Sequence, residues 1–266
     1  MTSALPYCGQ LVREQDPDRF LISLFAPPDR HEALWALFAF NYEIAKTREV
    51  VSETALGLAR LQWWREAIGK IYDNGDILKH EILTALAPAI RTYDLAREDF
   101  DTLIYAREFD LEDVLPSNMD GFLHYADFTG TPLMRLAAKI AGADDEMEPI
   151  EAVAINYAIA GLLRAVPFHA HERRCYLPED LMKQHGVTLR QLHDFLKPEP
   201  GLKDVVRSVA GHFVYKVKPQ DRMLKAAQRL AEIYMRQLAR NHYDPFANRM
   251  KLTPYFKALR VSLAAA

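Results

Sequence analysis

Apolar residues recur at steps of three and four along nearly the whole chain, and this helical period limits the possible folds more than any other feature. No segment alternates with the period of a strand, which argues against a sheet built from βαβ units. The sequence therefore predicts an all-α fold, with one domain spanning residues 1–266. The expected helices cover residues 16–25, 30–51, 54–72, 77–93, 97–111, 118–141, 147–166, 188–196, 202–217, 221–240 and 254–263.

Two capping boxes and one segment with two prolines predict where particular helices begin and end. Asp29 offers a side-chain acceptor at a helix start, and Glu32 stands three residues later to reach back. Thr188 and Gln191 repeat this pattern. Residues 197–201 are expected to form a loop between helices rather than a domain boundary.

Composition excludes several classes of protein. The net charge of −3 gives no general electrostatic reason to expect a nucleic-acid partner. Cys8 and Cys175 are too few for a disulfide framework or a zinc site of their own. There is no run of 18 apolar residues, and residues 1–20 lack the pattern of a secretory signal or a good transit peptide. A cytoplasmic protein is expected.

Three segments carry a resemblance to a known family. Residues 35–49 read WALFAFNYEIAKTRE, residues 161–178 read GLLRAVPFHAHERRCYLP, and residues 61–66 read LQWWRE. In frame and position, these segments resemble the signature helices of the squalene/phytoene synthase family. The resemblance spans most of the chain, and it implies a helical isoprenoid-synthase (trans-prenyltransferase) fold with a central cavity.

Members of that family carry a DDxxD-type motif in the first segment and a DxxED motif shortly before Tyr-Leu-Pro. Carboxylates three or four residues apart share one face of a helix. Two such faces across a cavity can hold Mg²⁺ ions that bridge the diphosphate of a substrate and stabilise its departure.

This chain departs from both motifs. Their acidic positions fall, in chain order, on Ala45, Lys46, Glu49, Ala165, Phe168 and His169. Glu49 alone keeps a carboxylate, while an alanine offers no ligand and a lysine repels a metal ion. The sequence therefore predicts no catalytic residues, no bound metal and no cofactor.

The altered pattern is most similar to a branch of the family that includes a mitochondrial assembly factor for respiratory complex I. The resemblance implies a non-catalytic protein that supports complex I assembly, by contacts with its subunits or other assembly proteins, or by holding an apolar or prenyl ligand. The alternative is a Mg²⁺-dependent prenyltransferase that condenses prenyl diphosphates. A lipid carrier that uses the cavity alone is a third hypothesis.

The former motif positions supply the candidate ligand residues. They are Asn41, Ala45, Arg48, Glu49, Arg164, Ala165, His169 and Tyr176. Arg48 and Arg164 are expected to pair with nearby carboxylates such as Glu49, and recognition of an anion is the alternative. A metal cluster of His169, His171 and Glu172 is disfavoured, because residues two apart do not align on a helix. Lys46 is expected to have a structural ion pair.

Two further features concern the surface. Trp63 and Trp64 point about 100° apart on a helix, so they are not expected to be equally buried. Residues 222–260 place many arginines and lysines among apolar residues. This region either buries its apolar stripe in the core or lies on a membrane with anionic lipids, peripherally at the inner face.

Overall fold

The computed structural model describes residues 5–112, 114–195 and 200–266, and within these residues it contains helices and no strand. The predicted all-α class is confirmed. The elements are α1 (Tyr7–Gln15), α2 (Pro17–Ser23), η1 (Pro28–Arg30), α3 (His31–Ala45), α4 (Thr47–Val50), α5 (Thr54–Tyr72), α6 (Glu81–Thr92), α7 (Arg97–Glu112), α8 (Met119–Ala141), α9 (Met147–Arg164), α10 (Val166–His171), α11 (Glu179–Gln184), α12 (Leu189–Phe195), α13 (Pro200–Ala210), α14 (Arg222–Arg240), η2 (Asn248–Lys251) and α15 (Lys257–Ala265).

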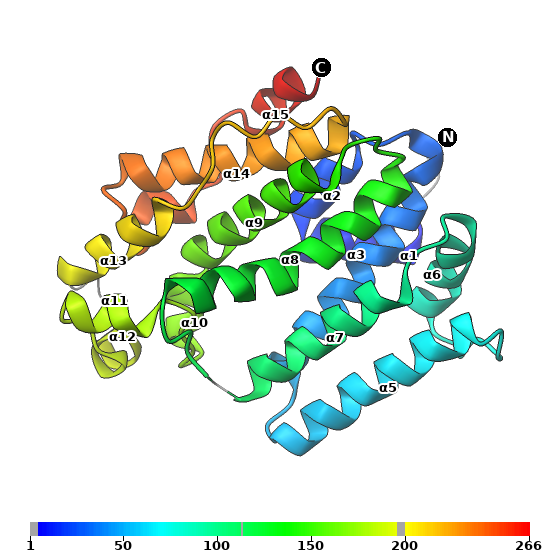
Figure 1. Ribbon diagram of the computed structural model, residues 1–266, viewed down its shortest axis with the longest axis horizontal. Helices are drawn as coiled ribbons and strands as arrows, with labels where there is room; N and C mark the ends of the chain where they lie inside the picture. The colour runs from blue at the N-terminus through cyan, green and yellow to red at the C-terminus, as the bar shows by residue number, and fades with distance from the viewer. Residues whose placement is uncertain (1–4, 113, 196–199) are drawn as a thin grey trace.

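The long helices form a curved layer, and shorter contacts from α2 and α3 close it. Helices α5, α7, α8, α9 and α14 lie in that order, each against the next (Figure 1). Helix α3 contacts α7 and α8 from one side, and the short α2 contacts both α3 and α14. The elements α2 and α3 therefore close the layer and surround its interior.

The sequence explains why α3 and α9 lie at the centre. Helix α3 is apolar on nearly all sides, and residues 34–41 are all buried. A helix that is hydrophobic all round belongs inside a protein. On α8, Gly130 permits close approach to α9, because a Cβ atom there would lie 3.1 Å from the Ala154 carbonyl oxygen.

Both helices that carry the family motifs break at a motif position. The helix predicted over residues 30–51 ends at Ala45 and resumes at Thr47, and the Glu49 N–H donates to the Lys46 carbonyl in a tightened turn. The helix predicted over residues 147–166 ends at Arg164, and α10 begins at Val166 with a proline in its first turn. Proline suits a helix start because it has no N–H to donate.

One predicted cap is confirmed and the other is wrong. The Thr188 hydroxyl accepts from the Gln191 N–H at 3.2 Å, and the Gln191 side chain accepts from the Thr188 N–H at 3.1 Å. The box predicted at Asp29 does not form. Its residues wind into the 3₁₀ turn η1, and Arg30 caps α3 with no side-chain hydrogen bond.

Two helices were not expected, α1 and α11. Helix α1 is short, and its Gly9 lies against the ring of Trp35, which leaves no space for a Cβ atom. Packing on α3, rather than local sequence, therefore stabilises α1. Of the predicted loop at 197–201, residues 197–199 lie outside the described residues, and Pro200 and Gly201 begin α13.

Candidate ligand cavity

A hollow of about 350 Å³ lies between α2, α3, α7, α8, α9 and α10. Part of its wall is apolar and includes Phe38, Leu133 and Met134. Both former motif segments reach it, because its lining includes Ala45, Glu49, Arg164, Ala165, His169 and Tyr176. Asn41 and Arg48 are not part of this lining. Asn41 is instead buried inside α3, and Arg48 lies on α4.

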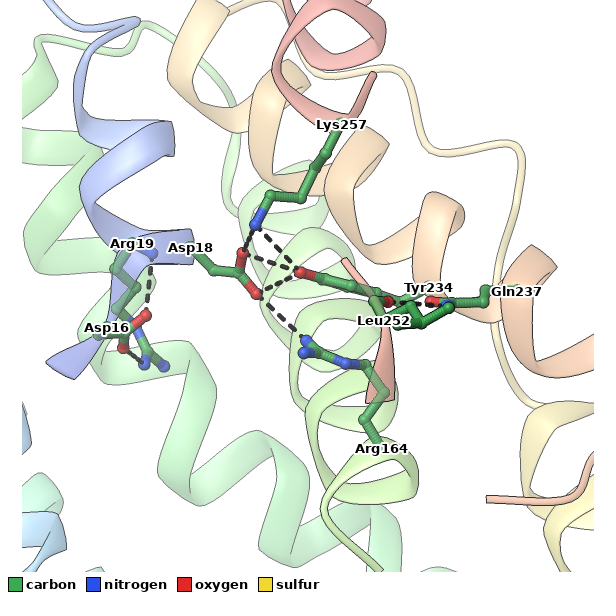
Figure 2. A network of polar contacts seen from close by, with 8 residues as sticks. All are labelled: Asp16, Asp18, Arg19, Arg164, Tyr234, Gln237, Leu252 and Lys257. Carbon is green, nitrogen blue, oxygen red and sulfur yellow. Dashed lines mark hydrogen bonds and ion pairs between the residues drawn. The ribbon is translucent and has the colours of Figure 1, made fainter. Parts of the chain in front are cut away.

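One side of the hollow is organised around the carboxylate of Asp18 (Figure 2). Lys257 Nζ lies 2.6 Å from Oδ1, and Arg164 Nη1 lies 3.1 Å from Oδ2. The Tyr234 hydroxyl donates to the same carboxylate at 2.7 Å. The Arg164 guanidinium also lies 3.4 Å from the centre of the Tyr234 ring, a cation–π contact. One carboxylate thus joins α2, α9, α14 and α15.

This arrangement holds Asp18 in its charged form. Burial opposes ionisation, but the hydrogen bonds from Lys257 and Tyr234 outweigh it, so the pKa of Asp18 lies below its ordinary value. Beside it, Asp16 caps α2 by accepting from the Arg19 N–H at 2.9 Å, and it also pairs with the Arg19 guanidinium. Both carboxylates are therefore neutralised by cations within hydrogen-bonding reach.

The other side of the hollow is organised around Asp110 of α7. Tyr125 and Tyr176 donate their hydroxyls to Oδ1 at 2.7 and 2.9 Å, and their rings stack with centres 4.9 Å apart. Arg107 Nη1 lies 3.2 Å from Oδ2. Burial, and next the charge of Asp110, raise the pKa of Tyr125 well above its ordinary value, so this phenol stays protonated and donates.

His169 completes this side as an uncharged residue. Its ring meets the ring of Tyr176 with centres 4.7 Å apart. Burial, and next the charge of Arg174, lower the pKa of His169 to about 4. At neutral pH the imidazole therefore adds no charge, while Arg174 lies 3.7 Å from the carboxylate of Glu49.

Each carboxylate that lines the hollow, among the described residues, thus contacts an arginine or lysine side chain. The pairs are Asp16 with Arg19, Asp18 with Lys257 and Arg164, Glu49 with Arg174, and Asp110 with Arg107. Mg²⁺ needs carboxylate oxygens that are free to bind it. Within the described ranges, no group of three or more His, Cys, Asp or Glu side chains could hold a metal ion. The residues present do not fit the family's magnesium cluster.

The predicted ion pairs of Arg164 and Lys46 are confirmed. Arg164 does pair with a carboxylate, but the partner is Asp18 of α2 instead of Glu49. Lys46 has the expected structural ion pair, at 2.6 Å from Glu43. No sequence pattern indicated Asp18, Asp110, Tyr234 or Lys257, because these side chains meet only when distant helices pack.

The two surface expectations have separate outcomes. Trp64 is buried, whereas Trp63 is 39% exposed, which confirms that the pair is unequal. In the C-terminal region, α14 buries its apolar stripe, while several large apolar side chains of residues 252–263 remain exposed. None of the helices in the described part of the chain is long and apolar enough to cross a membrane.

Known relatives fall into two groups. The chain is 34% identical over 209 residues to complex I assembly factor 6 of Bos taurus and 32% identical to that of Homo sapiens, covering 77% of this chain and 61% of each relative. It is 24% identical over 170 residues to presqualene diphosphate synthase of Sinorhizobium fredii, covering 63% of this chain and 60% of that one. The matched region thus spans about three fifths of the length of these relatives. As expected, the similarity to the assembly factors is the higher of the two.

Solved structures give the same fold. A dehydrosqualene synthase bound to a ligand matches with a TM-score of 0.79 at 17% identity, covering 97% of this chain and 94% of that chain. A squalene synthase from Alicyclobacillus acidocaldarius matches with a TM-score of 0.75 at 19% identity, covering 90% and 94%. The family model for squalene/phytoene synthase matches residues 12–256. The chain therefore belongs to the squalene/phytoene synthase family and has its isoprenoid-synthase fold.

Proposed function

We propose that the protein is a non-catalytic member of its family that supports the assembly of respiratory complex I, the NADH:ubiquinone oxidoreductase. It acts by contacts with complex I subunits or other assembly proteins, or by holding an apolar ligand in the hollow. We expect it to work in the cytoplasm and peripherally at the inner face of the membrane.

One observation carries this proposal. Every carboxylate that lines the hollow and belongs to the described residues contacts a guanidinium or an ammonium group, so none is free to bind Mg²⁺. Without the metal, only arginines that already pair with carboxylates line the hollow, so little positive charge is left to stabilise a departing diphosphate. The identity to the assembly factors is higher than the identity to a presqualene diphosphate synthase, which supports the same proposal.

A working prenyltransferase is the competing function, supported by the preserved hollow and the similarity to presqualene diphosphate synthase. Calorimetry with farnesyl diphosphate, with and without Mg²⁺, separates the two functions. We expect Mg²⁺ to leave the affinity unchanged and no condensed product to form. Tightening by Mg²⁺, together with product, would establish the prenyltransferase instead.

Gly161 offers a way to decide between a bound ligand and protein contacts. It lines the hollow, and a Cβ atom there meets nothing within 4 Å. The variant Gly161→Leu should fill the space without disturbing α9, since leucine is the better helix former by about 1 kcal/mol. Gly161→Ala is the matched control that leaves the hollow open.

Complementation of a deletion strain then tests the function itself. Deletion should lower the level of assembled complex I and leave isoprenoid products unchanged, and wild-type protein should restore the complex. If the hollow holds a ligand, Gly161→Leu fails to restore complex I while Gly161→Ala succeeds, and native mass spectrometry finds the ligand only in the wild type and Gly161→Ala. If protein contacts suffice, both variants restore it. Normal complex I in the deletion strain contradicts the proposal.

A further inference from the structure

The C-terminal part of the chain has a charge opposite to the rest. Residues 222–266 contain nine lysines and arginines but only two acidic residues, a formal charge of +7 in a chain whose total is −3. This part comprises α14, η2 and α15, and α15 lies along α14 at the edge of the molecule (Figure 1). The family match ends at residue 256, so α15 lies beyond it.

Helix α15 turns one side to the protein and a markedly apolar side outward. Val261 and Ala265 are buried against the body of the molecule. On the other side, Phe256, Leu259 and Leu263 are 77%, 55% and 73% exposed. A step of four residues places Leu259 and Leu263 on one face of the helix, and Phe256 is the residue directly before its first turn. Just before the helix, Leu252 and Tyr255 are also exposed, at 58% and 81%.

Cations without acidic partners surround this apolar face. In the part of the chain that the structure describes, Arg240, Arg249, Lys251 and Arg260 form no ion pair with a carboxylate. On the α15 helix, Arg260 falls on the same side as Leu259 and Leu263. Partial burial, and next the nearby Arg229, Arg240 and Arg236, lower the pKa of Arg260. Like charges gathered in this way repel one another unless an anion joins them.

Polar contacts with the rest of the protein already hold the C-terminal segment, residues 249–265, in place. Lys257 is held by Asp18, and Arg222 Nε donates to the Ala265 carbonyl at 3.1 Å. The Gln237 side chain donates to the Arg249 carbonyl at 2.7 Å and to the Leu252 carbonyl at 3.1 Å, and Figure 2 shows the contact with Leu252. A surface that is preformed needs little further ordering when it binds.

We propose that this C-terminal face, formed by Leu252, Tyr255, Phe256, Leu259 and Leu263 with Arg240, Arg249, Lys251 and Arg260, is a docking surface for a lipid bilayer that carries anionic headgroups. The apolar side chains enter the boundary between headgroups and acyl chains, and the cations contact the lipid phosphates. The charge of the surface and its outward aromatic and leucine side chains match such a bilayer, which requires no complementary groove. This binding rests on the peripheral membrane location of the proposed function and gives it a surface, but it does not depend on the role in assembly.

Flotation of the full chain with vesicles tests the docking surface. The wild type should bind vesicles that contain phosphatidylglycerol, bind pure phosphatidylcholine vesicles weakly, and lose affinity as salt increases. The double variant Leu259→Ser/Leu263→Ser should weaken binding to the anionic vesicles by at least about tenfold, since each leucine loses the burial that the bilayer provides. Arg240→Gln/Arg260→Gln should also weaken it by about tenfold or more.

Matched controls come from exposed residues elsewhere on the surface. Leu56→Ser/Leu58→Ser on α5 removes two exposed leucines, and Arg13→Gln/Arg91→Gln removes two exposed arginines from α1 and α6. Both control variants should float like the wild type. If the control and the test variants weakened vesicle binding equally, nonspecific electrostatic or hydrophobic adsorption would determine binding, and not this face.

Failure of the wild type to float with anionic vesicles also overturns the proposal. If that wild type instead self-associates, by light scattering, in a manner that Leu259→Ser/Leu263→Ser abolishes, the face belongs to an interface between copies. Neither result depends on complex I levels, so failure here is distinct from failure of the assembly function.

Discussion

The hollow and the C-terminal face are both rich in arginine and lysine, but the two regions use these side chains differently. In the hollow, each cation neutralises a carboxylate beside it, as Lys257 and Arg164 do for Asp18. On the C-terminal face, Arg240 and Arg260 have no carboxylate partner within the described residues and lie among exposed apolar side chains. Charges that are paired internally stabilise the fold, whereas unpaired charges remain available to an anionic surface.

Removal of Asp18 should have the largest effect on stability. Asp18→Ala leaves Lys257 and Arg164 without their partner at a partly buried site, and loss of one member of such a cluster costs up to about 3–5 kcal/mol. Unfolding in denaturant, followed by circular dichroism, measures the difference. A loss below about 1 kcal/mol would mean that the hollow is as tolerant of unpaired charge as the surface, and the contrast between the two regions would disappear.

The pH dependence of His169 comes next. Its folded pKa of about 4 lies below the ordinary value of 6.5, so the unfolded chain binds a proton first and stability falls as pH drops from about 6.5 towards 4. The contribution is at most about 3 kcal/mol. His169→Leu should flatten the curve over this range, whereas the exposed His171→Gln should follow the wild type. Parallel curves for wild type and His169→Leu would contradict the burial of this ring.

A milder change at Asp110 should have a smaller effect. Asp110→Asn keeps an oxygen that can accept from Tyr125 and Tyr176 but removes the charge that faces Arg107, so we expect a loss of about 1–3 kcal/mol. Asp110→Ala, which removes the acceptor as well, should cost more. Equal losses for the two variants would show that the tyrosine hydroxyls gain nothing from this residue. Denaturant unfolding of both variants side by side measures the difference.

The smallest effect is expected on the C-terminal face. Arg240→Gln/Arg260→Gln should change the free energy of unfolding by no more than about 0.5 kcal/mol, because surface substitutions without partners rarely do more. Because the substitutions remove repulsion between arginines, we expect a small increase in the free energy of unfolding. Thermal unfolding of the double variant tests this. A large loss would show that these arginines have structural partners and would remove the difference between the two regions.

The sequence predictions were correct where interactions between residues close in the chain determine the structure. The bounds of α5 at 54–72 are those predicted, and the cap at Thr188 formed between residues three apart, whereas the same spacing at Asp29 gave no cap. The predictions failed where packing decides. Gly9 allows α1 to lie against Trp35, and no local pattern reports that contact.

In the candidate site too, local sequence predicted some residues, and packing between distant helices determined the others. The frame of the two motifs was enough to place Ala45 and Ala165 at one hollow, since each lies on a helix with a fixed position in the fold. The partners of Asp18 could not be found in this way. Tyr234 and Lys257 follow it by more than two hundred residues, and only the closure of the layer by α2 brings them together.

The position of Asp18 at the meeting point of four helices has a mechanical consequence. If α2 moved alone, it would leave Lys257 and Arg164 without their carboxylate, and if α15 moved alone, Asp18 would lose Lys257, at a cost of up to several kcal/mol. Small independent openings of these helices are therefore suppressed, and hydrogen exchange should report them as one cooperative unit. Opening of the hollow and detachment of α15 are then expected to occur together, because both break contacts of the Asp18 carboxylate.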